Sequence, residues 1–109
     1  MTLADYQQGA ARTLNSALTG TERLVDASAG LAEEAGEVLA HVRKHAFQRH
    51  ALDRDRLQTE LGDALWCLAA TATAAGLSLG DIAAHNLEKL RQRYPDGFNE
   101  AASRAKRTE

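Results

Sequence analysis

Two short stretches of the chain each carry a pair of acidic side chains three residues apart. Glu34 and Glu37 form the first pair, and Glu60 and Asp63 form the second. In an α-helix, residues three apart lie on the same side, so each pair would form a short acidic stripe. Carboxylate oxygens are the ligands that hard divalent cations such as Mg²⁺ prefer. The two pairs are therefore well suited to bind a divalent metal ion.

Each acidic pair borders an apolar arc with the spacing of an amphipathic helix. The two arcs consist of Leu31, Ala35, Val38, Leu39 and Val42, and of Leu57, Leu61, Ala64, Leu65, Leu68 and Ala72. If the two helices pack antiparallel as neighbours, the acidic stripes come together at the edge of the core. Four carboxylates in one place repel one another unless a cation is present. The pattern thus predicts a metal site between two neighbouring helices.

Start and stop signals predict an all-α bundle of about four main helices. We expect helices from Thr2 to about residue 19, from about 27 to 47, from 53 to about 75, and from 78 to 93. Residues 21–26 are expected to form a lead-in turn or a short extra helix before the second of these. Asp53 and Ser78 are the expected N-caps of the last two. The fourth helix is expected to turn its apolar side chains inward, namely Ile82, Leu87 and Leu90. Residues 1–98 then form a single domain and residues 99–109 a polar C-terminal tail, for which we expect either a short exposed helix or disorder.

The composition fits one helical domain. The chain has 109 residues and a formal net charge of −2, which gives no basis for binding nucleic acid or an acidic membrane surface. The single cysteine, Cys67, cannot form an internal disulfide, which favours a reducing compartment. The longest apolar run, residues 64–77, is too short to span a membrane, and we see no signal peptide. We therefore expect a cytoplasmic protein.

Three motifs in this order resemble the MazG-like nucleoside triphosphate pyrophosphohydrolases. They are E-E-x-x-E at residues 33–37, E-x-x-D at the start of residues 60–68 (ELGDALWCL), and residues 86–98 (NLEKLRQRYPDGF). The resemblance covers nearly the whole chain. It implies an all-α fold that oligomerises and hydrolyses an NTP or dNTP to the monophosphate and pyrophosphate. It also implies Mg²⁺ as the cofactor, with Mn²⁺ as a substitute.

The resemblance implies a catalytic set of five acidic residues. Glu34, Glu37, Glu60 and Asp63 would be the metal ligands. Glu33 lies about 100° around the helix from Glu34, further from the apolar border, and is a weaker candidate that could bind an additional metal or orient the water. Cleavage between the α and β phosphates needs an attacking water and neutralisation of triphosphate charge, which metal ions held by acidic side chains supply.

The expected substrate contacts lie mainly on the fourth predicted helix. Asn86, Lys89 and Arg93 share one face at i, i+3 and i+7, which could present an amide and two cations to a triphosphate. The resemblance places Asn86 and Lys89 among the nucleotide contacts. Tyr94 and Lys44 are further candidates for the phosphates.

Trp66 is the large ring nearest to the expected base pocket. Relatives often have Tyr after this Trp, whereas this chain has Cys67, so the preferred base does not follow from the resemblance. A packing or subunit-interface role for Trp66 is favoured over a base platform, and Cys67 fits a small buried apolar residue.

Simpler interpretations exist for the other candidates. The acidic quartet could be solvated charges beside the core, and the fourth-helix cations could be an ordinary exposed face favoured by the helix dipole. His41 and His45 lie one turn apart and could recruit Zn²⁺. A ferritin-like di-iron site is disfavoured because neither Glu34 nor Glu60 has a histidine three residues later.

Four Ala-rich helices bury little apolar area per residue, which favours assembly with other copies. We expect a homodimer or a dimer of dimers (a homotetramer), with each nucleotide pocket near a subunit boundary. The expected role is nucleotide-pool housecleaning. A dedicated pyrimidine deoxynucleotide or oxidised-nucleotide diphosphatase is one alternative, and a non-enzymatic metal-binding or helical interaction module is the other.

Overall fold

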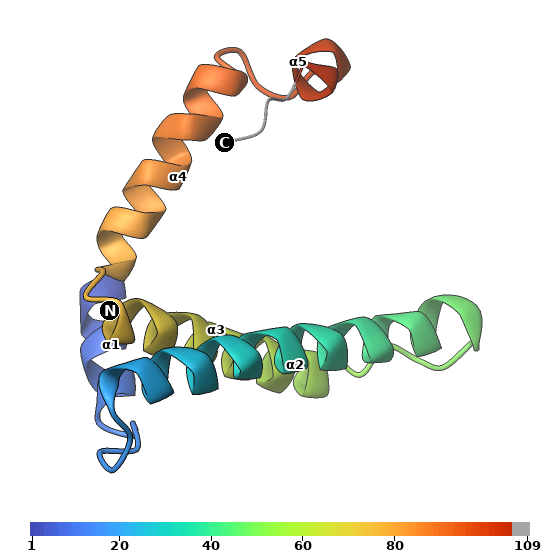
Figure 1. Cartoon of the computed structure of the whole chain (residues 1–109). Helices are drawn as coiled ribbons and strands as arrows, with labels where there is room; N and C mark the ends of the chain where they lie inside the picture. The colour runs from blue at the N-terminus through green and yellow to red at the C-terminus, as the bar shows by residue number, and fades with distance from the viewer. Residues whose placement is uncertain (106–109) are drawn as a thin grey trace.

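The chain forms five helices in a computed structural model that describes residues 1–105 (Figure 1). They are α1 (Leu3–Ala11), α2 (Gly20–Phe47), α3 (Arg54–Ala74), α4 (Leu79–Arg93) and α5 (Glu100–Arg104). Within the described residues the only bridge of β type is an isolated one between Pro95 and Gly97. The all-α prediction is confirmed. The short α5 lies in the predicted tail, where a short exposed helix is one of the two expectations. The last part of the predicted tail, residues 106–109, lies outside the described residues.

The first two helices have different limits from those predicted. α1 ends at Ala11 rather than near residue 19, and α2 begins at Gly20 rather than Ala27. The cause is a capping box at Thr19. Its hydroxyl accepts a hydrogen bond from the Glu22 N–H (3.2 Å), and the Glu22 carboxylate accepts one from the Thr19 N–H (2.8 Å). The T-x-x-E pattern of a capping box therefore marks the start of α2 in the sequence, although the apolar periodicity of this helix becomes clear only later.

The later helix boundaries agree with the prediction. Asp53 caps α3 by accepting a hydrogen bond from the Arg56 N–H, and Ser78 caps α4. Gly76 ends the α3 segment with a φ of +71°, a left-handed conformation that favours glycine. α4 begins three residues later, at Leu79, and the axes of α3 and α4 differ by 103°.

α2 and α3 form a long hairpin, and α1 lies across one end of it (Figure 1). α4 points away from the hairpin and makes its main helix contact with α1. The buried core at this junction is small. Ala69, Ala72 and Leu79 form it, with Tyr6 and Ala10 packed against them.

The structure covers only part of each predicted apolar arc. Leu31, Val38, Leu57 and Ala64 are half-buried, but Leu39 and Leu61 remain 58% and 52% exposed. The exposed members of the arcs also include Ala35, Val42, Leu65 and Leu68. The hairpin thus presents an exposed leucine-rich face.

The expectation that α4 turns Ile82, Leu87 and Leu90 inward is wrong for the isolated chain, since all three are exposed. The physical reason is the direction of α4. A helix that points away from the hairpin has no second layer on which to bury its apolar side chains.

Among residues 1–105, no single helix has both the length and the hydropathy needed to cross a membrane. Only α3 and α4 taken together, as a pair bent by 103°, satisfy those two criteria.

Candidate active site

The α2–α3 hairpin brings the acidic residues of both helices to the same neighbourhood. Burial raises the pKa of the Glu34 carboxyl, and the negative charges of Asp63, Glu33, Glu37 and Glu60 raise it further. Such repulsion weakens as the distance between the charges grows. The packing of α2 against α3 therefore brings Glu60 and Asp63 within electrostatic range of Glu34, whose own helix carries Glu33 and Glu37. The roles of these acids as metal ligands or catalytic groups stay predictions.

Glu60 is the most deeply buried of these acids, with 8% of its surface exposed. Its Oε1 atom accepts a hydrogen bond from Arg56 Nε at 3.0 Å. Its Oε2 atom is buried and has no hydrogen-bond partner. A buried carboxylate oxygen without a partner is costly, and a bound cation would remove that cost.

The set of donors fits a divalent cation in chemical type. Among residues 1–105, however, no three His, Cys, Asp or Glu side chains are gathered closely enough to hold a metal ion. Glu33, Glu37 and Asp63 are exposed at the surface of the hairpin, so their side chains have room to rotate. Repulsion among like charges favours the open arrangement when no cation is bound.

Lys44 lies at the tip of the hairpin in a pocket of about 190 Å³. The other residues that line this pocket are His41, His50, Ala51, Asp53 and Arg56. Because Arg56 also binds Glu60, the pocket is next to the acidic neighbourhood. The sequence analysis missed Arg56, although its position one helical turn before Glu60 is a signal for such an ion pair.

The geometry of the structure does not support a zinc site formed by His41 and His45. His45 Nδ1 lies 2.9 Å from the backbone oxygen of His50, so this ring faces the loop rather than a shared metal position with His41. Within the described part of the chain, residues 1–105, these histidines belong to no group of three His, Cys, Asp or Glu side chains that could hold a metal ion.

The fourth-helix candidates are not brought to the acids within one chain. Asn86 and Lys89 line a separate pocket of about 380 Å³ on α4, and Arg93 lies near its C-terminal end. The Arg93 guanidinium is 6.0 Å from the centre of the Tyr94 ring. Because α4 points away from the hairpin, these predicted phosphate contacts and the carboxylates occupy different regions of the molecule (Figure 1).

Trp66 and Cys67 of α3 both contact other segments of the chain, Trp66 the loop after α1 and Cys67 the helix α2. The Trp66 indole N–H donates a hydrogen bond to Thr13 Oγ1 at 2.8 Å, which ties the loop after α1 to α3. The Cys67 thiol is buried, and a Cβ atom on Gly30 would lie only 3.0 Å from its sulfur. Glycine at position 30 therefore permits the close approach of α2 to α3. These contacts are structural, and a role for Trp66 in the base pocket stays a prediction.

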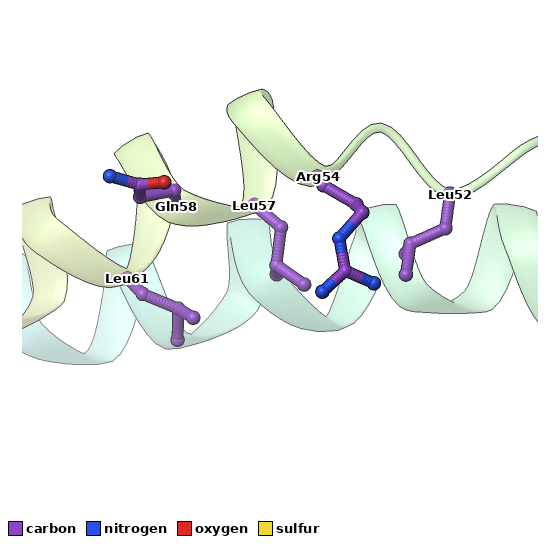
Figure 2. Close-up of a pocket in the computed structure, with 5 residues that line it drawn as sticks. All are labelled: Leu52, Arg54, Leu57, Gln58 and Leu61. Carbon is purple, nitrogen blue, oxygen red and sulfur yellow. The ribbon is translucent and has the colours of Figure 1, made fainter.

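A third pocket, of about 310 Å³, lies near the start of α3 (Figure 2). Its lining residues are Leu52, Arg54, Leu57, Gln58 and Leu61. Figure 2 shows the three leucine side chains directed to the same side of the chain as Arg54. This pocket has no carboxylate, and it adjoins the exposed leucine-rich face of the hairpin. Its chemistry suits apolar packing rather than metal binding.

Comparison with known proteins gives one family and one relative. The profile described as the MazG nucleotide pyrophosphohydrolase domain matches residues 25–98. The Gene 37 protein of Mycobacterium phage L5 is 36% identical over 72 residues, which cover 62% of this chain. The matched part spans 63% of that phage protein, whose name describes no activity. No solved structure matches the chain.

Proposed function

The chain belongs to the MazG nucleotide pyrophosphohydrolase family, and on that premise we propose that it hydrolyses a nucleoside or deoxynucleoside triphosphate to the monophosphate and pyrophosphate. The proposed cofactor is Mg²⁺, with Mn²⁺ as a substitute. The proposed role is nucleotide-pool housecleaning in the cytoplasm.

The observation that carries this proposal is the buried Oε2 atom of Glu60, which has no hydrogen-bond partner. On the facing helix, burial raises the pKa of Glu34, and the negative charges of Asp63, Glu33, Glu37 and Glu60 raise it further. Glu34, Glu37, Glu60 and Asp63 would hold the cation. When bound, Mg²⁺ neutralises charge on the triphosphate and makes an attacking water more acidic. Glu33 would orient that water or bind an additional metal ion.

Cationic residues next to the acids would bind the phosphate groups. Lys44 and Arg56 line the pocket at the hairpin tip, and Arg56 already contacts Glu60. An arginine between a carboxylate and a phosphate can hold both through separate N–H donors. Asn86, Lys89, Arg93 and Tyr94 would supply contacts from α4, and Trp66 would border the base.

The exposed apolar faces support a homodimer or a dimer of dimers. Leu61, Leu65 and Leu68 recur at helical spacing on α3, and Ile82 and Leu90 lie exposed on α4. A second copy would cover such surfaces. It would also allow α4 of one chain to approach the acids of another, which places the nucleotide pocket near a subunit boundary. Light scattering that returns a monomer at micromolar concentration would contradict this assembly.

The direct test is pyrophosphate release from a panel of canonical, pyrimidine deoxy- and oxidised nucleoside triphosphates, with Mg²⁺, with Mn²⁺ and with EDTA. We expect metal-dependent pyrophosphate and monophosphate from at least one nucleotide. Metal binding without turnover on the whole panel would instead favour the alternative, a non-enzymatic metal-binding or helical interaction module, which the exposed apolar faces would also suit.

A further inference from the structure

One side chain of α1 connects three helices at the base of α4. The Gln7 amide nitrogen donates a hydrogen bond to Thr73 Oγ1 near the end of α3 (3.1 Å) and another to the backbone oxygen of Leu77 (2.9 Å). The Gln7 amide oxygen accepts a hydrogen bond from the Leu79 N–H at 2.7 Å. Leu79 is the first residue of α4. Gln7 therefore joins α1 to the end of α3, the intervening turn and the start of α4.

Within one chain, few other contacts determine where α4 points. Its main helix contact is with α1, through the buried Leu79 side chain beside Tyr6 and Ala10. The turn that precedes it is short and contains Gly76, whose backbone is conformationally permissive. Small changes at this turn would therefore rotate the whole of α4 relative to the hairpin.

We propose that Gln7 is a positioning residue that sets the direction of α4 and thereby places Asn86, Lys89 and Arg93 for nucleotide binding. This inference rests on the proposed function. Leu79 and Arg93 are 14 residues apart along α4, a lever of about 21 Å at 1.5 Å per residue. A tilt of about 10° at the base would move Arg93 by about 4 Å, more than the length of a hydrogen bond.

The chemistry of the junction requires an amide at position 7. The Leu77 carbonyl needs a donor, and the Leu79 N–H, an unsatisfied group at a helix N-terminus, needs an acceptor. Glutamine supplies both from one side chain. Glutamate would keep the acceptor but place a negative charge against the Leu77 oxygen, and alanine would supply neither.

The test compares Gln7→Ala with the matched control Gln8→Ala, since Gln8 is an exposed glutamine on the same helix. Spin labels on Arg43→Cys and Gln92→Cys report the separation of α2 and α4 by pulsed electron paramagnetic resonance. Labelled chain is diluted with unlabelled chain, so that each assembly holds one labelled copy. The chain without the introduced cysteines is treated with the same reagent, and this control measures any reaction at the buried Cys67. We expect a broadened distance distribution for Gln7→Ala and the wild-type distribution for Gln8→Ala.

Activity is measured in the same variants without the label cysteines. We expect Gln7→Ala to raise KM for the nucleotide about tenfold, as the loss of these hydrogen bonds allows α4 to move. The kcat should stay within about twofold, because the proposed metal ligands lie on the hairpin. Thr73→Val removes one of the three hydrogen bonds and should give a smaller rise in KM. It also provides the test if Gln7→Ala fails to fold.

An unchanged distance distribution in Gln7→Ala, or a broadened distribution with an unchanged KM, would overturn the proposal. A fall in kcat with constant KM would overturn it as well. If the wild type hydrolyses no nucleotide, the proposed function fails, whereas the distance measurement still decides whether Gln7 sets the direction of α4.

Discussion

The α2–α3 hairpin and α4 carry the two halves of the candidate site, and they are supported in different ways. The hairpin is held by extensive pairing of two long helices, with Glu34 and Glu60 inside or beside the contact. α4 meets the rest of the chain mainly at its base, through Leu79 and the Gln7 hydrogen bonds. The acidic half is therefore built within one chain. The cationic half depends on a junction and, in our proposal, on a second copy.

This difference separates the expected effects of mutations. A change in the hairpin acids should affect the chemical step without altering where α4 points. A change on α4 should weaken nucleotide binding and leave the hairpin intact. The following predictions test that division, beginning with the largest expected effect.

Glu60→Gln and Asp63→Asn should each reduce turnover by more than about 100-fold. Removing a residue that only hydrogen-bonds a metal ligand costs up to about 100-fold in activity, and removing a ligand itself should cost more. Thermal unfolding should show equal or slightly greater stability for Asp63→Asn, because one of several crowded negative charges is gone. Glu60→Gln also loses the ion pair with Arg56 and should therefore be no more stable than the wild type. Asp55→Asn, an exposed acid in the first turn of the same helix, is the matched control and should retain activity. Unfolding of Asp63→Asn would show that this carboxylate is structural.

Leu65→Glu should convert the oligomer to monomer. In a symmetric dimer, exposing two leucines costs about 3 kcal/mol, a weakening of roughly 100-fold, and the added charges weaken association further. Light scattering and turnover at several protein concentrations would measure this effect. An oligomer as stable as the wild type would show that the leucine-rich face of the hairpin is not the interface.

Lys89→Gln should raise KM for the nucleoside triphosphate by about tenfold to 100-fold, the worth of a charge-assisted contact to phosphate. The kcat at saturation and the unfolding temperature should change little. Steady-state kinetics on the best nucleotide of the panel would check this. A large fall in kcat would show that Lys89 also takes part in the chemical step, and it would contradict the separation of nucleotide binding on α4 from chemistry on the hairpin.

Glu34→Gln should flatten the pH dependence of stability in the absence of divalent metal. The folded chain raises the pKa of Glu34 above its usual value of 4.5, so its contribution to stability is fully present below that pH. That contribution is lost as the pH rises through the raised pKa, because the folded state then gives up a proton it holds more strongly than the unfolded state. Melting curves of both proteins across this range would measure the difference, and identical profiles would contradict the prediction.

Several features of the fold follow from local residue patterns. The apolar spacing around Leu31 and Leu57 predicts helices, and Asp53 and Ser78 mark helix starts that the structure has. The apolar periodicity of α2 is clear only from Ala27 onward, whereas the capping box at Thr19 begins the helix. Local hydrogen bonding thus decided a boundary that the apolar pattern did not reveal.

The sequence by itself determined the all-helical fold and the two acidic pairs, because helix propensity, capping and spacing are properties of neighbouring residues. The tertiary structure alone decided that Glu60 is buried with an unpaired oxygen, that Arg56 contacts it, and that Trp66 is tied to Thr13. It also decided the direction of α4, since that direction depends on hydrogen bonds between Gln7 and a turn some 70 residues away along the chain. Contacts between distant segments leave no periodic signal in either segment, and for this reason they become visible only once the helices are packed.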